Sequence, residues 1–282
     1  MTTPPPGRRR RLRIALALLL VTLCGVAVTA AGCADRLIMP PVPPVREGDG
    51  SPRVLIQRGD GRVLESFRAR SPGAKDAEPR AFVLRFTGDA NTAAKWTADR
   101  WRQRPVEAWV VNYPGYGGSS GPRTLRALAE AALVAHDEMR RVAGNRPIIV
   151  EGFSLGTVPA LHVAANRPVA GVIVQNPPPL RQIVLWHHGW WNLWLLAGPV
   201  AWSLPREVDS IANAKRCHAK AAFLIAEKDQ DVPPNLQREI HDAYAGEKRL
   251  ILQRGAGHVA PLDERTMAEV QEAMSWMLAE PK

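Results

Sequence analysis

The chain has 282 residues but only three cysteines, Cys24, Cys33 and Cys217. Cys24 lies inside an apolar N-terminal stretch, Cys33 stands at the end of that stretch, and Cys217 is far from both. If Cys33 carries a lipid, Cys217 has no partner with which to form a disulfide. So few cysteines at such spacing argue against a disulfide framework and against a zinc site of the cysteine type.

Clustered positive charge is also missing from most of the chain, although the formal net charge is +10. Residues 1–32 hold five arginines and no acidic residue, and without them the net charge is +5. The other basic residues are scattered, which does not predict a nucleic-acid-binding surface. A basic patch that faces anionic lipid stays an alternative interpretation. The hydrophobic content of 46% is typical of a globular protein and excludes a disordered one.

Charged residues are absent from Ile14 to Ala31, directly after the arginines at positions 8–11 and 13. A cationic region, an apolar region and small residues at the end form the layout of a signal peptide. The ending Ala30-Ala31-Gly32-Cys33 resembles a bacterial lipobox, in which the chain is cut before a cysteine that becomes lipidated. We therefore expect residues 1–32 to be a signal peptide or membrane anchor, with lipidation of Cys33. An uncleaved anchor and simple secretion are the alternatives, because the apolar run is just long enough to span a bilayer.

The residue after this cysteine is Ala34 and not Asp, which in a bacterial lipoprotein resembles an outer-membrane address. Residues 33–52 are rich in proline and predict a tether that holds the domain off the membrane. Residues 53–282 are long enough for one large domain with a sizeable core. The expected location of that domain is the bacterial cell envelope, outside the cytoplasm and on the periplasmic side.

Short apolar runs alternate with helical patterns after residue 52, and no internal repeat is evident. Strands are predicted at 53–57, 62–68, 81–86, 107–112, 147–151, 169–175, 220–226 and 249–253. Helices are predicted at 125–142, 155–165 and 263–278, with one more between the last two strands. This alternation indicates βαβ units, and therefore an α/β fold with a mostly parallel central sheet.

Two serines, Ser119 and Ser154, lie in matches to the pattern Gly-x-Ser-x-Gly. The apolar run 148–150 leads directly into GFSLG at 152–156, and a helical pattern follows at once. This is the context of a nucleophile elbow, where glycines allow a strained backbone and a close approach of strand and helix. The surroundings of Ser119 are rich in Gly and Pro and predict a loop. The sequence therefore favours Ser154 as a nucleophile.

A serine hydroxyl needs a base that takes its proton, and the base needs an orienting carboxylate. Among the seven histidines, His258 lies in a glycine-rich loop that follows a predicted strand and precedes the final helix, where a general base is expected. The acid is expected after the strand at 220–226, where Glu227, Asp229 and Asp231 offer carboxylates. Asp229 is the first choice and Asp231 the second.

A tetrahedral oxyanion needs two preorganised hydrogen-bond donors. The first candidate is the backbone N–H of Leu155, which follows the serine directly. The second is the backbone N–H of Asp89, in the turn after the strand at 81–86. A metal role for His187 and His188 is not favoured, because adjacent residues point apart and no third ligand is evident. The reaction of such a serine implies no cofactor and no metal.

Together these motifs resemble the α/β-hydrolase family in its serine-hydrolase branch. The resemblance covers about residues 53–280 and is carried by YPGYG at 113–117, GFSLG at 152–156, DQDVP at 229–233 and GH at 257–258. It implies a mostly parallel sheet with helices on both faces. In that family the triad acid stands four residues before the proline, which favours Asp229 over Asp231. The oxyanion turn reads Thr-Gly-Asp here, where the family usually has His-Gly-Asn or similar.

Five of the nine tryptophans lie between Trp186 and Trp202. The resemblance places them in a small helical cap, at about residues 177–214. One interpretation is a lid that faces acyl chains or lipid, because tryptophan favours boundaries between apolar and wet surroundings. The other is a cap that packs on its own domain, since exposed clustered aromatics favour aggregation.

The function that this sequence predicts is hydrolysis of carboxylic esters or thioesters through Ser154, Asp229 and His258, with an acyl-enzyme. A peptidase of the same fold and a hydrolase fold that only binds, as an envelope scaffold, are the alternatives. The expected partners are a small acyl ester or thioester and the membrane that holds the N-terminus. The acyl chain length, the physiological substrate and the oligomeric state do not follow from the sequence.

Overall fold

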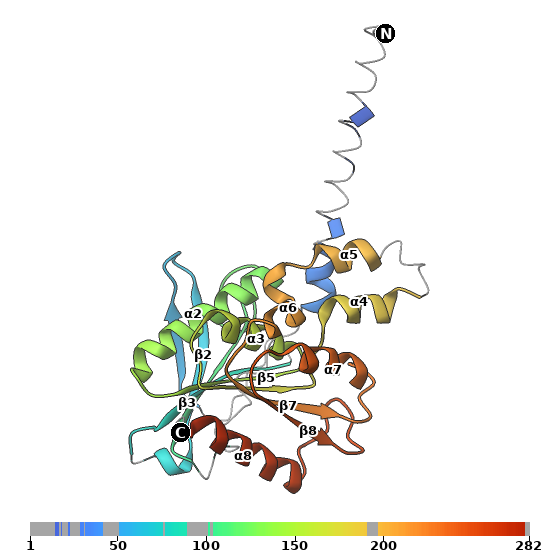
Figure 1. Ribbon diagram of the computed structural model, residues 1–282. Helices are drawn as coiled ribbons and strands as arrows, with labels where there is room; N and C mark the ends of the chain where they lie inside the picture. The colour runs from blue at the N-terminus through green and yellow to red at the C-terminus, as the bar shows by residue number, and fades with distance from the viewer. Residues whose placement is uncertain are drawn as a thin grey trace, which may run out of the picture.

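The protein is described by a computed structural model at residues 15–16, 18, 22, 29–30, 32–41, 51–75, 77–88, 101, 104–190 and 197–279. Eight strands form one sheet in the order β1-β2-β4-β3-β5-β6-β7-β8 (Figure 1). The strands are β1 (Arg53–Gln57), β2 (Val63–Arg70), β3 (Ala81–Phe86), β4 (Val106–Val111), β5 (Ile148–Phe153), β6 (Gly171–Gln175), β7 (Lys220–Ala226) and β8 (Lys248–Gln253).

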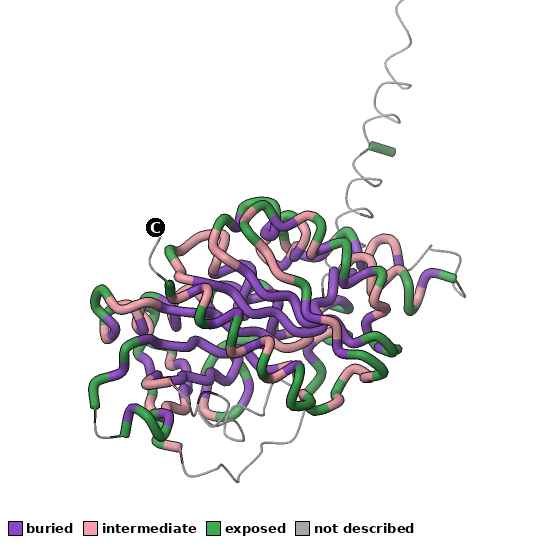
Figure 2. The backbone as a smooth tube through the Cα atoms, turned by 60° about the horizontal axis from the view of Figure 1, so that its bottom comes forward, coloured by how far each residue is buried: buried purple, intermediate pink, exposed green. Residues whose placement is uncertain are grey.

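The sheet is parallel from β4 to β8, and only β2 pairs antiparallel with its two neighbours, β1 and β4. The predicted strands lie within two residues of the observed ones at nearly every end, and the predicted mostly parallel sheet is confirmed. The central strands are mostly apolar because both faces of a parallel sheet are covered, and their buried charges Arg85 and Glu151 lie 3.8 Å apart as an ion pair. All seven residues of β7 except Lys220 are buried, and Figure 2 shows buried residues concentrated along the strands.

Helices cover both faces of the sheet, as the sequence resemblance implies. They are α2 (Leu125–Ala143), α3 (Thr157–Asn166), α6 (Ser210–Ala214), α7 (Pro234–Ala243) and α8 (Glu264–Leu278). Side chains from α2, α3, α6 and α7 pack on one face, where Leu84, Val150 and Val174 point. Side chains of α8 pack on the other face, against Val83, Ile149 and their neighbours. Because side chains alternate along each strand, the two faces have separate cores.

The cap lies between β6 and β7, where it was predicted, and consists of α4 (Leu180–His188), α5 (Ala197–Ser203), the short η5 (Arg206–Val208) and α6. Leu180, Leu204 and Val208 of the cap belong to the same core cluster as α2. The cap is therefore anchored on the domain through its inner face. Trp191 and Trp194 lie outside the described residues.

Part of the segment predicted as a tether lies against the domain. Residues 32–38 are helical, and Ala34 and Met39 are 1% and 2% exposed in the same core cluster as the cap. Asp35 Oδ1 accepts the backbone N–H of Leu125 at 2.8 Å, which satisfies a free donor at the first turn of α2. This segment is thus fixed to the domain by apolar contacts and by a hydrogen bond.

Most of the predicted apolar N-terminal segment, and the arginines before it, lie outside the described residues. Cys33 is described and exposed. Among the residues that the structure describes, no helix combines the length and the apolar character needed to cross a membrane.

Candidate active site

The turn at Ser154 has the geometry that the glycines on either side predict. Ser154 follows β5 with a φ of 50°, in the left-handed region that non-glycine residues rarely adopt. A Cβ at Gly152 would lie 2.5 Å from the Gly156 carbonyl oxygen, and a Cβ at Gly156 would lie 2.2 Å from the Phe86 carbonyl oxygen. Neither position has room for a side chain, so the turn needs both glycines. A strained backbone held by its surroundings is typical of functional sites.

Three side chains that are far apart in the sequence meet beyond this turn. His258 Nε2 lies 2.8 Å from Ser154 Oγ, and His258 Nδ1 lies 2.7 Å from Asp229 Oδ2. The His258 ring also lies over Phe153, with ring centroids 5.4 Å apart. In the tautomer with a proton on Nδ1, the ring donates to Asp229 and accepts the proton of Ser154 through Nε2. This arrangement can remove a proton from the serine as it attacks.

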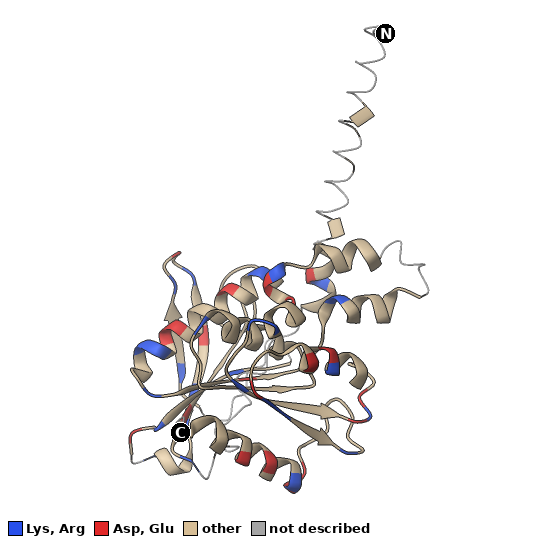
Figure 3. Cartoon of the chain, viewed as in Figure 1, with Lys and Arg blue, Asp and Glu red and all other residues tan. Residues whose placement is uncertain are grey.

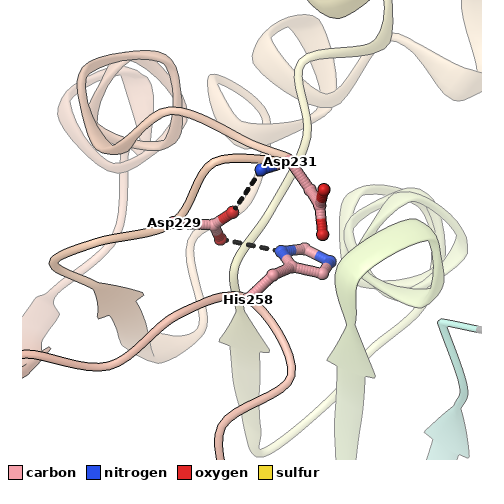
Figure 4. Close-up of side chains that lie close together, drawn as sticks. All are labelled: Asp229, Asp231 and His258. Carbon is pink, nitrogen blue, oxygen red and sulfur yellow. Dashed lines mark hydrogen bonds and ion pairs between the residues drawn. The ribbon is translucent and has the colours of Figure 1, made fainter.

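The Asp229 carboxylate is buried and has several hydrogen-bond donors. Its Oδ1 accepts the backbone N–H groups of Asp231 at 3.0 Å and Val232 at 2.8 Å. Its side chain is 0% exposed, whereas Asp231 is exposed. Figure 4 shows the Asp229 carboxylate bonded to the His258 ring, with the Asp231 carboxylate close to the ring but joined to it by no hydrogen bond. The structure therefore places Asp229, the first choice for the acid, in contact with the histidine through Nδ1.

Glu227 serves a different purpose. Its Oε2 accepts the backbone N–H of Gly255 at 2.7 Å, in the loop that leads to the histidine. This carboxylate was one of the three candidates for the triad acid, and in the structure it accepts a hydrogen bond from the backbone of the histidine loop.

Two supporting residues were missed in the sequence. Gln237 of α7 is fully buried and donates through Nε2 to Asp229 Oδ2 at 2.9 Å. Asn176, with a φ of 53°, directly follows β6, donates to the His258 carbonyl at 2.7 Å and accepts the Ala226 N–H at 3.0 Å. Asn176 thus joins the ends of β6 and β7 to the histidine loop. A polar residue straight after a buried strand was a signal that could have found it.

The second serine has a structural role in its loop. Ser119 is 6% exposed, its Oγ accepts the Glu65 N–H at 2.9 Å, and it donates to the Asn112 carbonyl at 2.7 Å. The Glu65 carboxylate in turn accepts from Asn112 Nδ2 and from the Gly118 N–H. The hydroxyl of Ser119 therefore ties the loop that follows β4 to strand β2, and its hydrogen-bond partners are backbone groups.

Of the two predicted oxyanion donors, Leu155 lies within the described residues. Leu155 directly follows Ser154 in the short turn that leads into α3, so its N–H lies at the N-terminal end of a helix. Asp89 lies outside the described residues. Gly88 before it passes beside the serine, since a Cβ there would lie 3.1 Å from Ser154 Cβ and 2.8 Å from Phe153 Cδ1. The turn after β3 therefore does approach the serine, as the second donor requires.

Potential ligand atoms of Asp229, Asp231 and His258 lie within 4.8 Å of one another, a grouping that a cation could occupy in principle. The Asp229 oxygens already accept hydrogen bonds from three protein groups besides the histidine, and both ring nitrogens of His258 have partners. A cation would have to break these bonds, so the donor set does not fit a metal ligand set.

Comparisons with curated proteins give partial matches. The chain is 29% identical over 165 residues to an uncharacterized protein of Mycobacterium tuberculosis, which covers 57% of this chain and 56% of that protein. It is 44% identical over 71 residues to the human alpha/beta hydrolase domain-containing protein 17B, covering 23% of this chain and 24% of that protein. The matched part of the chain thus spans little more than half of the curated relatives at most. No family model matches the chain.

Solved structures match over most of the chain. An acetyl xylan esterase of Thermoanaerobacterium has a TM-score of 0.59 at 17% identity, over 89% of this chain and 92% of the esterase. An esterase of Pyrococcus furiosus has a TM-score of 0.63 at 15% identity, over 84% and 97%. An acylaminoacyl peptidase of Pyrococcus horikoshii has a TM-score of 0.61 at 13% identity, over 82% of this chain and 41% of the peptidase. At these identities the likeness concerns the fold, and the predicted fold class is confirmed.

Proposed function

We propose that this chain, an α/β-hydrolase by fold, is a serine hydrolase that cleaves carboxylic esters or thioesters. The observation that carries the proposal is the continuous contact from Ser154 Oγ through His258 to the buried Asp229 carboxylate, at 2.8 Å and 2.7 Å. A nucleophile, a base and an orienting acid in this order are what acyl transfer at a serine requires. A binding protein needs neither the contacts nor the strained turn.

In the first half of the proposed reaction, Ser154 Oγ attacks the acyl carbonyl carbon and its proton passes to His258 Nε2. Asp229 stabilises the resulting imidazolium and holds the ring in the productive tautomer. The carbonyl oxygen becomes an oxyanion, which the Leu155 N–H and a donor from the turn after β3 would stabilise. His258 then gives the proton to the departing alcohol or thiol, which leaves an ester of Ser154.

In the second half, a water molecule donates a proton to His258 Nε2 and its oxygen attacks the acyl carbon of the ester. Collapse of the second tetrahedral intermediate returns the proton to Ser154 Oγ and releases the carboxylic acid. No cofactor takes part in this scheme. The exposed Asp231 does not receive a role in it, because the buried Asp229 already occupies Nδ1.

Esterases among the fold neighbours, including the two described above, support ester substrates over peptides. The peptidase neighbour is matched over only 41% of its own length. The described residues of this chain form one domain, so most of that peptidase has no counterpart among them. A peptidase therefore stays the second candidate. Membrane attachment at the periplasmic side of a bacterial envelope, through Cys33 or the apolar segment before it, is part of the same proposal and is supported by the N-terminal sequence alone.

Labelling with a fluorophosphonate probe tests the proposal. Wild type and Ser119→Ala are expected to be labelled, and Ser154→Ala is not. Folded wild-type protein that stays unlabelled would favour a binding-only role. With labelling established, hydrolysis rates for a series of acyl esters and thioesters, compared with a peptide library, separate an esterase from a peptidase.

A further inference from the structure

The cap exposes large apolar side chains among its described residues. Trp186, Trp190 and Trp202 are 47%, 74% and 82% exposed. Residues 182–205 contain no Asp, Glu, Lys or Arg, and Figure 3 shows α4 and α5 almost without charged residues. Single exposed apolar side chains are common, but three exposed tryptophans within one uncharged stretch mark a surface that something covers. We call these three side chains the tryptophan face.

The N-terminal segment is fixed next to the cap. Residues 32–38 lie beside α4 and α5 at one end of the molecule (Figure 1), and the Tyr116 hydroxyl donates to the Pro40 carbonyl at 2.8 Å. The partly buried Ile38 and the cap residue Val200 pack against the same core cluster. The start of the domain is therefore fixed next to the cap.

The uncharged run Ile14–Ala31 ends only three residues before the buried Ala34. Three residues of extended chain span about 10 Å at most, so a membrane that holds this run lies close to the cap. Leu37, in the docked helix, is itself 47% exposed. A lipid bilayer is thus the partner that the sequence brings to this surface.

We propose that the tryptophan face of the cap lies in the interfacial layer of the bilayer that holds the N-terminus. Indole rings favour this layer because they combine a large apolar area with an N–H donor. The exposed Arg36 and Arg206 stand on the adjoining segments and suit anionic headgroups. This inference rests on the proposed membrane location, and not on the proposed hydrolysis.

The cap contacts a loop of the candidate active site. His187 Nε2, at the end of α4, lies 3.0 Å from the Asp231 carbonyl oxygen, so the cap touches the loop that carries Asp229. Val259, next to His258, is 79% exposed. A cap seated on lipid therefore holds the site at the membrane surface, which favours esters whose acyl chain resides in the bilayer over soluble esters.

Quenching by brominated lipid tests the contact without any need for catalysis. The full chain with Ser154→Ala is placed in vesicles of phosphatidylcholine and phosphatidylglycerol whose acyl chains are brominated near the headgroup. Trp190→Phe with Trp202→Phe removes two fluorophores from the face and is expected to lower the quenched fraction of the tryptophan emission. Trp276→Phe is the matched control, because Trp276 lies half-buried on α8, across the sheet from α2 and α3. Removing it is expected to raise the quenched fraction.

Equal quenched fractions in both variants, or no quenching at all, would overturn the proposal. A second experiment measures hydrolysis by the active chain carrying Trp190→Ser and Trp202→Ser. Hydrolysis of a long-chain ester embedded in vesicles is expected to fall at least about tenfold, because the loss of even one of the two buried apolar side chains from the interface has an effect of that size. Hydrolysis of a soluble acetyl ester is expected to stay unchanged. Wild type that cleaves neither ester would contradict the proposed function, while the quenching result would still decide the membrane contact.

Discussion

Gln237 Nε2 donates a hydrogen bond at 2.9 Å to Asp229 Oδ2, the oxygen that faces the histidine. The same Nε2 donates to the Val232 carbonyl at 2.7 Å, which fixes the side-chain amide. Gln237 is fully buried, so water does not replace it. The first helix after the acid loop therefore orients the acid as well as covering the sheet.

Replacing this amide should reduce activity without removing any reacting group. Gln237→Met keeps the volume and removes a donor from a buried carboxylate, which costs on the order of 1–3 kcal/mol and should lower kcat roughly tenfold. KM for a soluble ester should change little, since Gln237 does not face the serine. Steady-state kinetics measures both constants.

Asp229→Asn and Asp231→Asn test which of the two carboxylates orients His258. The first should lower kcat by about 10⁴-fold, because it removes the group that sets the tautomer of His258. The second should cost less than about tenfold if Asp231 only flanks the ring. A larger loss at Asp231 than at Asp229 would show that the acid has been misassigned.

The strained backbone at Ser154 predicts that two inactive variants differ in thermal stability. A non-glycine residue at φ 50° is strained by about 1 kcal/mol relative to glycine. Both Ser154→Ala and Ser154→Gly should abolish hydrolysis, but Ser154→Gly should unfold at the higher temperature of the two, because only glycine relieves the strain. Thermal denaturation followed by circular dichroism compares them. If Ser154→Gly is the less stable variant, the turn is not strained in the protein.

Glu65 should make the stability depend on pH. Burial, the largest influence, raises the pKa of its carboxyl, but hydrogen bonds from Gly118, Asn112 and Arg53 outweigh it and hold the pKa below its ordinary value of 4.5. A lowered pKa in the folded state adds stability that is present above 4.5 and is lost as the pH falls through the folded-state pKa. This carboxylate joins β1, β2 and the 112–119 loop, so the loss of its charge should lower the stability of the whole domain.

The measurement compares wild type with Glu65→Gln by urea unfolding at several pH values. At neutral pH the variant should be less stable by about 1–3 kcal/mol, because an amide N–H group meets the donors of the loop. The difference should shrink as the pH falls below 4.5. A difference that is constant across this range would mean that Glu65 does not titrate with folding.

The strands and helices followed from the sequence because their apolar runs were long and were separated by clear breakers. GFSLG at 152–156 could be recognised because both glycines are forced by backbone contacts with neighbouring residues. Asp229 and His258 could be proposed because each follows a predicted strand, and parallel strands all end at one edge of the sheet. That Asp229 and not Asp231 meets Nδ1 is a matter of how one loop folds, which spacing alone does not determine.

Gln237 could not be selected in the same way. Gln237 lies within an amphipathic helix, where a polar residue normally faces water. Only the packing of α7 against the acid loop turns its side chain inward. The docking of residues 32–41 was missed because a proline-rich segment predicts an extended chain. The burial of Ala34 and Met39 depends on their packing in the core cluster of α2 and the cap, which no local pattern encodes.

The two described cysteines should differ sharply in reactivity. Burial raises the pKa of the Cys217 thiol to about 12, and its Sγ donates weakly to the Leu161 carbonyl at 3.5 Å. The thiolate is the nucleophile in alkylation, so Cys217 should not react with iodoacetamide at pH 8 until the domain is unfolded in urea. Cys33 is exposed, and in protein made without lipidation it should react at once. In protein isolated from membranes, an acylated Cys33 has no free thiol and should stay unlabelled even in urea, when Cys217 becomes labelled. Mass spectrometry of the tryptic peptides reads both sites in one experiment, and rapid labelling of Cys217 in the native domain would contradict its position in the core.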